Sequence, residues 1–473
     1  MASPSSERRS PMAVPPEGWE PLMRAARLAA RPLERFLRIE AASGIVLLVA
    51  AAVALAWANS PWSGRYAGLW STVLGIQVGG FAFERTLEWF VNDALMVIFF
   101  FVVGMEIRRE IHHGELSGWR RAAIPAAAAL GGMLAPAALY LLVAGAPGTR
   151  AGWGVPMATD IAFAVGILTL LGSRVPPALR VLLLALAVID DLGAIVVIAI
   201  FYSSGVATSG LLVAAIGVGG IYVMQWLGVR SRLAYVAPAV VAWGGIYAAG
   251  VHPTIAGVIV GLVTPVRAWL GPEGLVGGLQ EELDRLSAPG PSALGAQEMD
   301  QSLRRIDAAR REALSPSESL VVALHPWVAF GIMPLFALAN AGVSLSGLAL
   351  DAAGWSVASG VALGLLVGKP VGILLAIWVA LRLRIGTLPL GLTTSHFVVL
   401  GVVAGVGFTM SLFIAQLAFP GGGALLAASK LGVLAASGAA AVLALLVGRA
   451  LLSPDGIAGA ARSADEAEGA AEV

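Results

Sequence analysis

The sequence predicts an all-α integral membrane protein with about twelve transmembrane helices, and three features of the chain support this prediction. Of the 473 residues, 58% are hydrophobic and only 12% are Asp, Glu, Lys or Arg, whereas soluble domains carry about 25% charged residues. So few polar side chains cannot coat a water-soluble body of this size. The apolar residues also gather in long runs that are typical of membrane-spanning helices. A soluble enzyme, a disordered protein and a nucleic-acid-binding protein are therefore excluded as descriptions of the whole chain.

The amino-acid composition narrows the chemistry further. The net charge is only +1 and the chain has no cysteine, so it has no strong field for an acidic partner and no disulfide or thiolate metal site. The 58 glycines and 26 prolines would break helices in a soluble protein. In a membrane bundle they permit close packing and interrupted helices.

Twelve apolar segments make up a membrane domain at residues 41–452. A helix needs about 20 residues to cross a bilayer, and the segments that approach this length are residues 41–59, 91–107, 122–144, 154–171, 178–202, 208–227, 234–250, 252–268, 320–341, 355–381, 394–419 and 424–452. Residues 1–40 form a basic tail, either solvated or lying as a helix on anionic lipid. Residues 453–473 are rich in Ala, Gly and acids and predict a disordered tail.

Arginines in the connections orient these spans, because cytoplasmic loops carry an excess of Lys and Arg. With a cytoplasmic N-terminus, only Arg65, Arg85 and Arg150 fall on the opposite side. The other arginines then belong to the cytoplasmic side. This bias predicts a multi-pass protein with both termini in the cytoplasm.

Two connections have structure of their own. Residues 73–84 alternate apolar and polar side chains about Gly79-Gly80, which predicts a small extracytoplasmic β-hairpin. Its free edge offers a pairing site for a second copy of the chain. Residues 269–319 form a long cytoplasmic loop, in which Met299, Leu303 and Ile306 have helical spacing and predict a surface helix.

An internal repeat is suggested by the pattern of spans. Spans three to five and ten to twelve are triplets of opposite orientation, and the middle span of each is broken by polar residues or glycine, at residues 158–160 and 405–409. The pattern predicts two inverted three-helix repeats with interrupted crossing helices. Interrupted segments at matching places in two halves are typical of a transporter binding site.

Few ionisable residues lie inside the spans, and each costs at least about 2.5–3.5 kcal/mol at the bilayer centre. Asp190 and Asp191 are adjacent in span five, Asp160 lies in span four and Lys369 in span ten. Neighbours on a helix point about 100° apart, so one acid of the pair can face a cavity while the other meets Asp160 or Lys369. A carboxylate there must hold a proton or a cation such as Na⁺, with the Thr159 hydroxyl and freed carbonyls as neutral ligands. Competition between the two ions is sufficient for exchange.

Structural roles compete with these functional ones. The acid pair might serve only as hydrogen-bonding groups between helices, although the cost of burying two acids argues against this. Asp160 is also suited to cap a helix within the broken span. Lys369 has three candidate roles: a structural salt bridge, a proton-releasing partner of an acid, and a cation that neutralises the negative C-terminal ends of half-helices.

A second group of titratable residues flanks the spans. Glu106, Arg109 and Glu110 have the i, i+3 and i+4 spacing of an ordinary surface ion pair, and a sensor role is equally compatible with it. His252 and His325 flank the spans, and histidine is the residue type most often used as a pH sensor near neutrality. Each histidine alone is more often structural.

At these residues the sequence closely resembles the bacterial NhaA-type Na⁺/H⁺ antiporters. The matching strings cover most of residues 40–450 in the family's order, and they are VNDALMVIFFFVVGMEIRREIHHGEL, PMATDIAFAVGILTLLGSRVP, LALAVIDDLGAIVVIAIFY, GVHPTIAGVIVG, LHPWVAFGIMPLFALANAGVSL, GLLVGKPVGI and GVGFTMSLFIAQLAF. The order of ATDIAFA, IDDLGAI and GKPVGI is highly specific.

The resemblance implies roles for the residues inside the spans. Asp190 is implied to be the main cation and proton site with Asp191 as its neighbour, or Asp191 to bind the ion directly, since the second acid of the pair usually does so in this family. Thr159 and Asp160 match the unwound stretch at the crossing of the broken helices. Lys369 matches the lysine near that crossing.

The resemblance also implies regulation and assembly. Glu106, Arg109, Glu110, His252 and His325 match parts of a cytoplasmic funnel tied to pH activation. The family is a homodimer in the bacterial inner membrane, contacts its partner through a hairpin like residues 73–84, and exchanges more protons than Na⁺ per cycle.

The sequence departs from the family at two places. Val321 and Val322 stand where an acid is usual, with Glu318 a turn earlier, and the preceding loop is longer than usual. Both departures concern the pH set-point and leave the exchange chemistry in place.

The sequence therefore predicts a secondary antiporter that exports Na⁺ or Li⁺ in exchange for H⁺ by alternating access. No enzyme activity, cofactor or nucleic-acid partner is expected. No nucleotide is expected either, since no phosphate-binding loop motif occurs. Another monovalent cation/H⁺ exchanger is the main alternative. An intramembrane aspartyl protease needs acids on facing helices and a GxGD motif, which this sequence lacks. A transport-dead sensor does not fit the intact set of buried charges.

Overall fold

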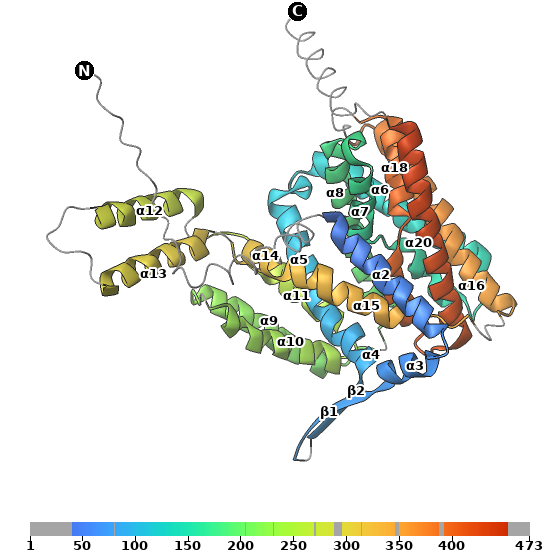
Figure 1. Cartoon of the computed structure of the whole chain (residues 1–473), viewed down its shortest axis with the longest axis horizontal. Coiled ribbons are helices and arrows are strands. Elements are labelled where there is room, and N and C mark those ends of the chain that lie inside the picture. Colours follow the sequence, from blue (N-terminus) through green and yellow to red (C-terminus); the bar gives the residue numbers. More distant parts are fainter. Residues whose placement is uncertain are drawn as a thin grey trace, which may run out of the picture.

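The computed structural model describes residues 40–452, apart from residues 80, 204, 230, 269–270, 288–295, 314, 346–349 and 387–391. The predicted tails at residues 1–40 and 453–473 lie outside these residues, except for Glu40, with which the first described helix begins. The described chain is a bundle of helices with one two-stranded hairpin at one end (Figure 1).

Each of the twelve predicted segments is helical. The unbroken segments are α2 (Glu40–Ala58), α4–η2–α5 (Leu87–Trp89, Phe90–Leu95, Met96–His113), α6 (Trp119–Ala144), α8 (Pro177–Phe201), α9 (Thr208–Trp226), α10 (Val236–Ala248), α11 (Thr254–Val263), α14–η7–α15 (Pro316–Trp327, Val328–Ile332, Met333–Asn340), α16–η8–α17 (Ala352–Leu363, Gly364–Gly368, Lys369–Arg382) and α20 (Gly423–Leu451). The broken segments are η4 with α7 (Arg150–Met157, Ile161–Leu170) and α18 with α19 (Thr394–Ala404, Phe408–Ala418). Shorter helices are α3 (Ser63–Ser71), η3 (Glu115–Ser117), η5 (Gly172–Arg174) and η6 (Arg232–Tyr235).

The number of spans is confirmed only in part. By length and composition, the described residues contain 7 helices able to cross a membrane, or up to 10 if each bent pair counts as one span. The predicted seventh and eighth spans correspond to α10 and α11, which are apolar but shorter. A total of twelve spans therefore stays a prediction.

The predicted β-hairpin is present. Strand β1 (Val73–Val78) pairs antiparallel with β2 (Phe81–Thr86), in a register from Val73 opposite Thr86 to Val78 opposite Phe81. Gly79 has φ of +59°, which side chains other than glycine rarely adopt. The hairpin projects from one end of the bundle, next to α3 and α4 (Figure 1). We call this the hairpin end of the molecule.

The long loop at residues 269–319 has more structure than its sequence suggested. The predicted surface helix is α13 (Ala296–Ala313), and a second helix, α12 (Gly271–Ser287), packs beside it. The prediction missed α12 because its glycine-rich start lowers helix propensity. The loop also ends early, since Ser315 and Glu318 form a capping box that begins α14 at Pro316.

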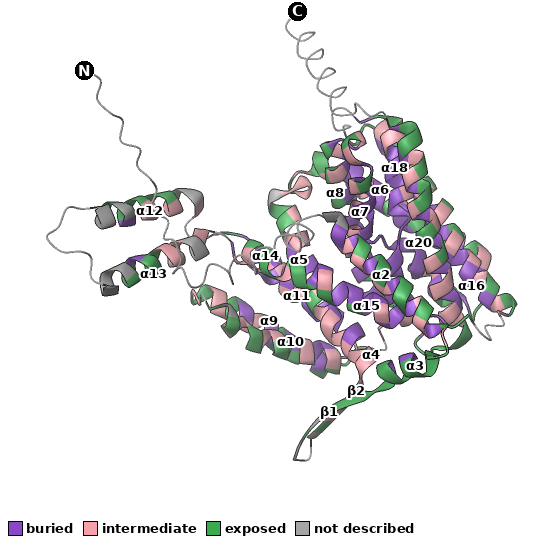
Figure 2. Cartoon of the chain, viewed as in Figure 1, coloured by how far each residue is buried: buried purple, intermediate pink, exposed green. Residues whose placement is uncertain are grey.

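Two groups of helices meet along the bundle. The crossing bundle, which contains both broken segments, comprises η4, α6–α8 and α16–α20, and α6 is its central helix. The side bundle comprises α4–η2–α5, α9–α11, α14 and α15, where α9 packs on α10 and α11 on α5. Buried residues concentrate in the crossing bundle, whereas α9 and α10 are largely exposed (Figure 2). Their exposed side chains include many apolar ones, as expected of lipid-facing helices.

Candidate ion-binding site

The two broken segments cross within the crossing bundle. The half-helices bend by 41° between η4 and α7, and by 45° between α18 and α19. The two breaks touch directly, because the Asp160 backbone N–H donates to the Val406 carbonyl at 2.8 Å. A Cβ on Gly407 would lie 2.2 Å from Ser411 Oγ and 3.0 Å from the Ala158 carbonyl, so the close approach requires glycine there.

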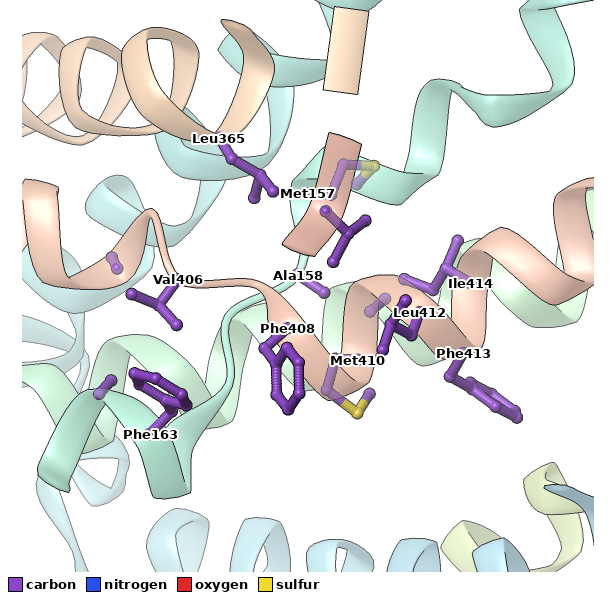
Figure 3. Packing of buried hydrophobic residues seen from close by; sticks show 14 of the residues in the cluster. Met157, Ala158, Phe163, Leu365, Val406, Phe408, Met410, Leu412, Phe413 and Ile414 are labelled. Carbon is purple, nitrogen blue, oxygen red and sulfur yellow. The ribbon is translucent and has the colours of Figure 1, made fainter. Parts of the chain in front are cut away.

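Apolar side chains surround this crossing. Figure 3 shows Ala158 and Val406 on the two extended breaks, with Phe163 and Phe408 beside them on the following half-helices. The Phe163 and Phe408 ring centroids lie 5.8 Å apart, and all four residues are buried. Polar groups at the crossing are therefore shielded from water and must find partners within the protein.

The two helix N-termini at the crossing share one carboxylate. Asp160 Oδ1 accepts a hydrogen bond from the Phe163 N–H at 3.0 Å, which caps α7. Asp160 Oδ2 accepts from the Thr409 N–H at 3.1 Å and from the Thr409 hydroxyl at 2.5 Å, in the first turn of α19. The capping role considered for Asp160 is thus present twice, and its negative charge faces two positive helix ends.

The two helix C-termini at the crossing are met by hydrogen-bond donors. Lys369 Nζ donates to the carbonyl of Met157, the last residue of η4. The Thr159 hydroxyl lies 3.2 Å from the carbonyl of Ala404, the last residue of α18. The Lys369 ammonium group thus lies at one negative helix end and the Thr159 hydroxyl at the other.

Lys369 also pairs with an acid. Its Nζ lies 2.7 Å from Asp190 Oδ2, and both side chains are almost completely buried. The same carboxylate oxygen lies 2.6 Å from the Thr159 hydroxyl, whose single proton can serve either Asp190 or Ala404 at one time. Lys369 thus makes an ion pair with an acid and a hydrogen bond to a half-helix C-terminus, which are the contacts that its candidate roles require.

Asp191 has a different environment from its neighbour. Both acids are 1% exposed, and the Oδ1 of each has no hydrogen-bond partner among the residues that the structure describes. Asp191 differs because neither a lysine nor a hydroxyl group bonds to its carboxylate in the described contacts, as Lys369 and Thr159 do to Asp190. The charges of Asp190, Asp160 and Glu106 act on Asp191. A buried carboxylate oxygen without a partner is costly unless it holds a proton or a cation.

All but one of the candidate pH-regulating residues lie on α5 and α14. Glu106 is half-buried on α5, where its charge interacts with Arg109 and with Asp191. Arg109 is exposed. Glu110 Oε1 accepts a hydrogen bond from the Glu115 N–H at 2.7 Å and so holds the turn after α5. His325 is exposed on α14, which packs against α5.

His252 lies apart from these residues. Its Nε2 is 3.4 Å from Asp93 Oδ1, and its ring meets the Phe413 ring edge-on at 5.4 Å. Asp93 is close to the hairpin in the chain, and Glu106 is about 20 Å further along the helix at 1.5 Å per residue. The structure therefore places His252 near Asp93 and well away from Glu106.

Several functional groups of the crossing are absent from the sequence-based site. Thr409 lies in the glycine-rich break that the sequence did mark, and only its contact with Asp160 reveals its role. The carbonyls of Met157 and Ala404 have no side-chain signature. In the described part of the chain, no three His, Asp or Glu side chains are arranged to hold a metal ion. A cation here would rely on one or two carboxylates and on neutral oxygens.

Buried charges at the crossing of two broken helices define an ion-coupled membrane transporter. Comparisons with known proteins agree. The family described as Na⁺/H⁺ antiporter 1 matches residues 34–447, and the chain belongs to this family.

Similar curated proteins cover nearly the whole chain. "Na(+)/H(+) antiporter NhaA 2" of Myxococcus xanthus is 70% identical over 456 residues, 96% of this chain and 97% of the relative. The protein of the same name from Sorangium cellulosum is 54% identical over 460 residues, 97% and 98% of the two chains. "Na(+)/H(+) antiporter NhaA" of Bordetella petrii is 49% identical over 452 residues, 93% and 96% of the two chains.

Proposed function

We propose that this protein exchanges Na⁺ for H⁺ across the bacterial inner membrane, and that both ions compete for the Asp191 carboxylate. The observation that carries the proposal is the contrast between two neighbouring acids. Oδ1 of both acids is buried without a partner in the described residues, but Asp190 is engaged by Lys369 and Thr159 through Oδ2, whereas no hydrogen bond or ion pair to Asp191 is found among those residues. An acid in that state needs an ion, and only one ion fits at a time.

The exchange cycle follows from this competition. Na⁺ is a hard cation that prefers oxygen ligands, so it displaces the proton from Asp191 and draws on nearby neutral oxygens such as the Thr159 hydroxyl. When Na⁺ also attracts Asp190, Lys369 loses its partner and releases a second proton to the same side. Two protons then move for each Na⁺, which makes the exchange electrogenic. Return of the protons on the other side of the membrane expels Na⁺.

The arrangement in the membrane is also part of this proposal. Twelve spans place both termini in the cytoplasm and the hairpin end outside, and the two triplets around the broken helices form inverted repeats. The proton gradient then drives export of Na⁺ or Li⁺. The free edge of the hairpin at residues 73–86 pairs with a second copy in a homodimer. Glu106, whose charge acts on Asp191, is the pH-regulating residue nearest the ion site by this argument.

Proton movement in inside-out membrane vesicles tests the proposal. A pH-sensitive dye reports an imposed proton gradient, and addition of Na⁺ or Li⁺ dissipates it in vesicles with the native protein. Asp191→Asn reduces this response to that of vesicles without the protein, while Asp190→Asn retains a slower exchange. Asp300→Asn is the matched control, since Asp300 is exposed on α13 and bonds only to Arg304 in the described contacts.

Two results would contradict this assignment. Normal exchange by both Asp190→Asn and Asp191→Asn would place the ion site elsewhere. A response to K⁺ without one to Na⁺ or Li⁺ would show a different monovalent cation/H⁺ exchanger.

A further inference from the structure

Three side-chain amides meet at the hairpin end. Asn92 Nδ2 donates to Gln416 Oε1 at 2.7 Å, and Asn340 Nδ2 donates to Asn92 Oδ1 at 2.7 Å. Gln416 Nε2 in turn donates to Asn340 Oδ1. We call these three residues the amide clasp.

The clasp is largely buried and closed on itself. Asn340 is completely buried, Asn92 is 8% exposed and Gln416 is half-buried. Buried amides are costly unless bonded, and here each amide donates to one neighbour and accepts from another. Gln416 also donates to Glu88 Oε1 at 3.2 Å, and the charge of Glu88 interacts with Lys430 on α20.

The clasp connects the two groups of helices. Asn92 lies in η2 and Asn340 at the end of α15, both in the side bundle. Gln416 lies on α19, the half-helix whose first turn is bound by Asp160. A relative movement of the crossing bundle and the side bundle at this end must therefore break the bonds of Gln416, while the bond between Asn92 and Asn340 can persist.

An aromatic layer lies deeper on the same three helices. Phe413 precedes Gln416 on α19, Phe336 lies one turn before Asn340 on α15, and Phe100 lies beyond η2 on α5. The Phe413 ring centroid is 5.4 Å from that of Phe100 and 6.2 Å from that of Phe336. All three are buried. Each helix thus supplies one amide and one aromatic ring, which form two successive layers of contacts between the side bundle and α19.

We propose that the amide clasp is the gate on the hairpin side of the ion site, closed while the site is shut from that side and open when the site faces it. This inference rests on the proposed exchange by alternating access, and it adds residues to the transport cycle that do not bind the ion. Neutral amides suit a contact that must part repeatedly, because water satisfies them in the open state.

Cross-linking tests whether the clasp must open. The natural chain has no cysteine, so Asn340→Cys with Gln416→Cys supplies the only thiols for a short bifunctional methanethiosulfonate reagent. The cross-linked protein is expected to lose Na⁺-driven proton movement in proteoliposomes and to regain it on reduction. Ala144→Cys with Gly360→Cys is the control pair within the crossing bundle, where a Cβ on Gly360 would lie 3.4 Å from Ala144 Cβ. Its cross-link should leave exchange unchanged.

Different outcomes of the cross-linking experiment would overturn the gate and the proposed exchange activity. Undiminished exchange in the cross-linked clasp pair, or equal loss in both cross-linked pairs, would overturn the gate. Absence of Na⁺-driven proton movement in the natural chain would instead refute the proposed function.

Labelling gives a second readout that does not depend on the cysteine pair. Met333→Cys places a buried thiol, whose labelling rate can be measured, on the face of α15 that carries Phe336 and Asn340. It lies two helical turns before Asn340 in the chain. Gln416→Ala removes both bonds of Gln416 to the side-bundle amides, and about tenfold faster labelling by an impermeant thiol reagent on the hairpin side is expected. Leu417→Ala is the matched control on the adjacent position and leaves the rate unchanged. Equal labelling rates with Gln416→Ala and Leu417→Ala would overturn the proposal.

Discussion

The charged crossing and the amide clasp are both buried polar clusters, yet they use different chemistry. At the crossing, Asp160, Asp190, Asp191 and Lys369 all belong to the crossing bundle. At the clasp, neutral amides join that bundle to the side bundle. Separating a buried ion pair costs several kcal/mol, whereas a neutral hydrogen bond contributes about 1 kcal/mol net. In the proposed cycle, the charges of the crossing therefore stay within one bundle, and the amide–amide bonds of the clasp that part are uncharged.

The largest effect is expected from removal of the lysine at the crossing. Lys369→Met leaves the Asp190 carboxylate buried without its cation, and breaking such a pair costs about 3–5 kcal/mol. The double variant with Asp190→Asn removes both charges and should recover most of this loss. Thermal unfolding in mild detergent, measured for both single variants and the double variant, gives the coupling energy between the two residues.

One result of this double-mutant measurement would contradict the comparison between the charged crossing and the amide clasp. If the double variant were as unstable as Lys369→Met alone, the lysine would stabilise the crossing through its bond to the Met157 carbonyl. The ion pair with Asp190 would then be incidental to stability.

The next effect concerns the carboxylate that holds two helix ends. Asp160→Asn retains the shape of the side chain but removes the charge facing α7 and α19, and charge-assisted hydrogen bonds are worth about 1.5–3 kcal/mol. Thr409→Val removes only the hydroxyl contact, which leaves the two N–H bonds to Asp160 in place. Unfolding of the two variants should therefore show the greater loss for Asp160→Asn. A greater loss for Thr409→Val would mean that the hydroxyl, and not the helix ends, needs the carboxylate.

The residues of the crossing were largely predictable from the sequence. Charged residues are costly inside a membrane span. Asp160, Asp190, Asp191 and Lys369 could therefore be recognised from the sequence as charged residues within apolar segments. The sequence did not reveal which acid meets Lys369, because adjacent positions on α8 differ only in direction. That choice depends on the rotation of α8 against α17, a tertiary property that the structure supplies.

The clasp was not predictable in the same way. Asn92, Asn340 and Gln416 are neutral, lie far apart in the chain, and each resembles an ordinary polar residue near a helix end. Only the packing of η2, α15 and α19 brings them together. The hairpin shows the opposite case, since alternation about Gly79 specified its strands locally.

The smallest expected effect tests whether charge matters at the clasp. Glu88→Gln preserves an oxygen that can accept from Gln416 Nε2 but removes the charge that interacts with Lys430. Because neutral amide bonds close the gate in this comparison, the exchange rate should change by less than about threefold, the equivalent of a weak pair. Glu88→Leu, which also removes the acceptor, should have the larger effect in the same proton-flux assay. If Glu88→Gln abolished exchange, the clasp would depend on charge as the crossing does, and the distinction between the two clusters would fail.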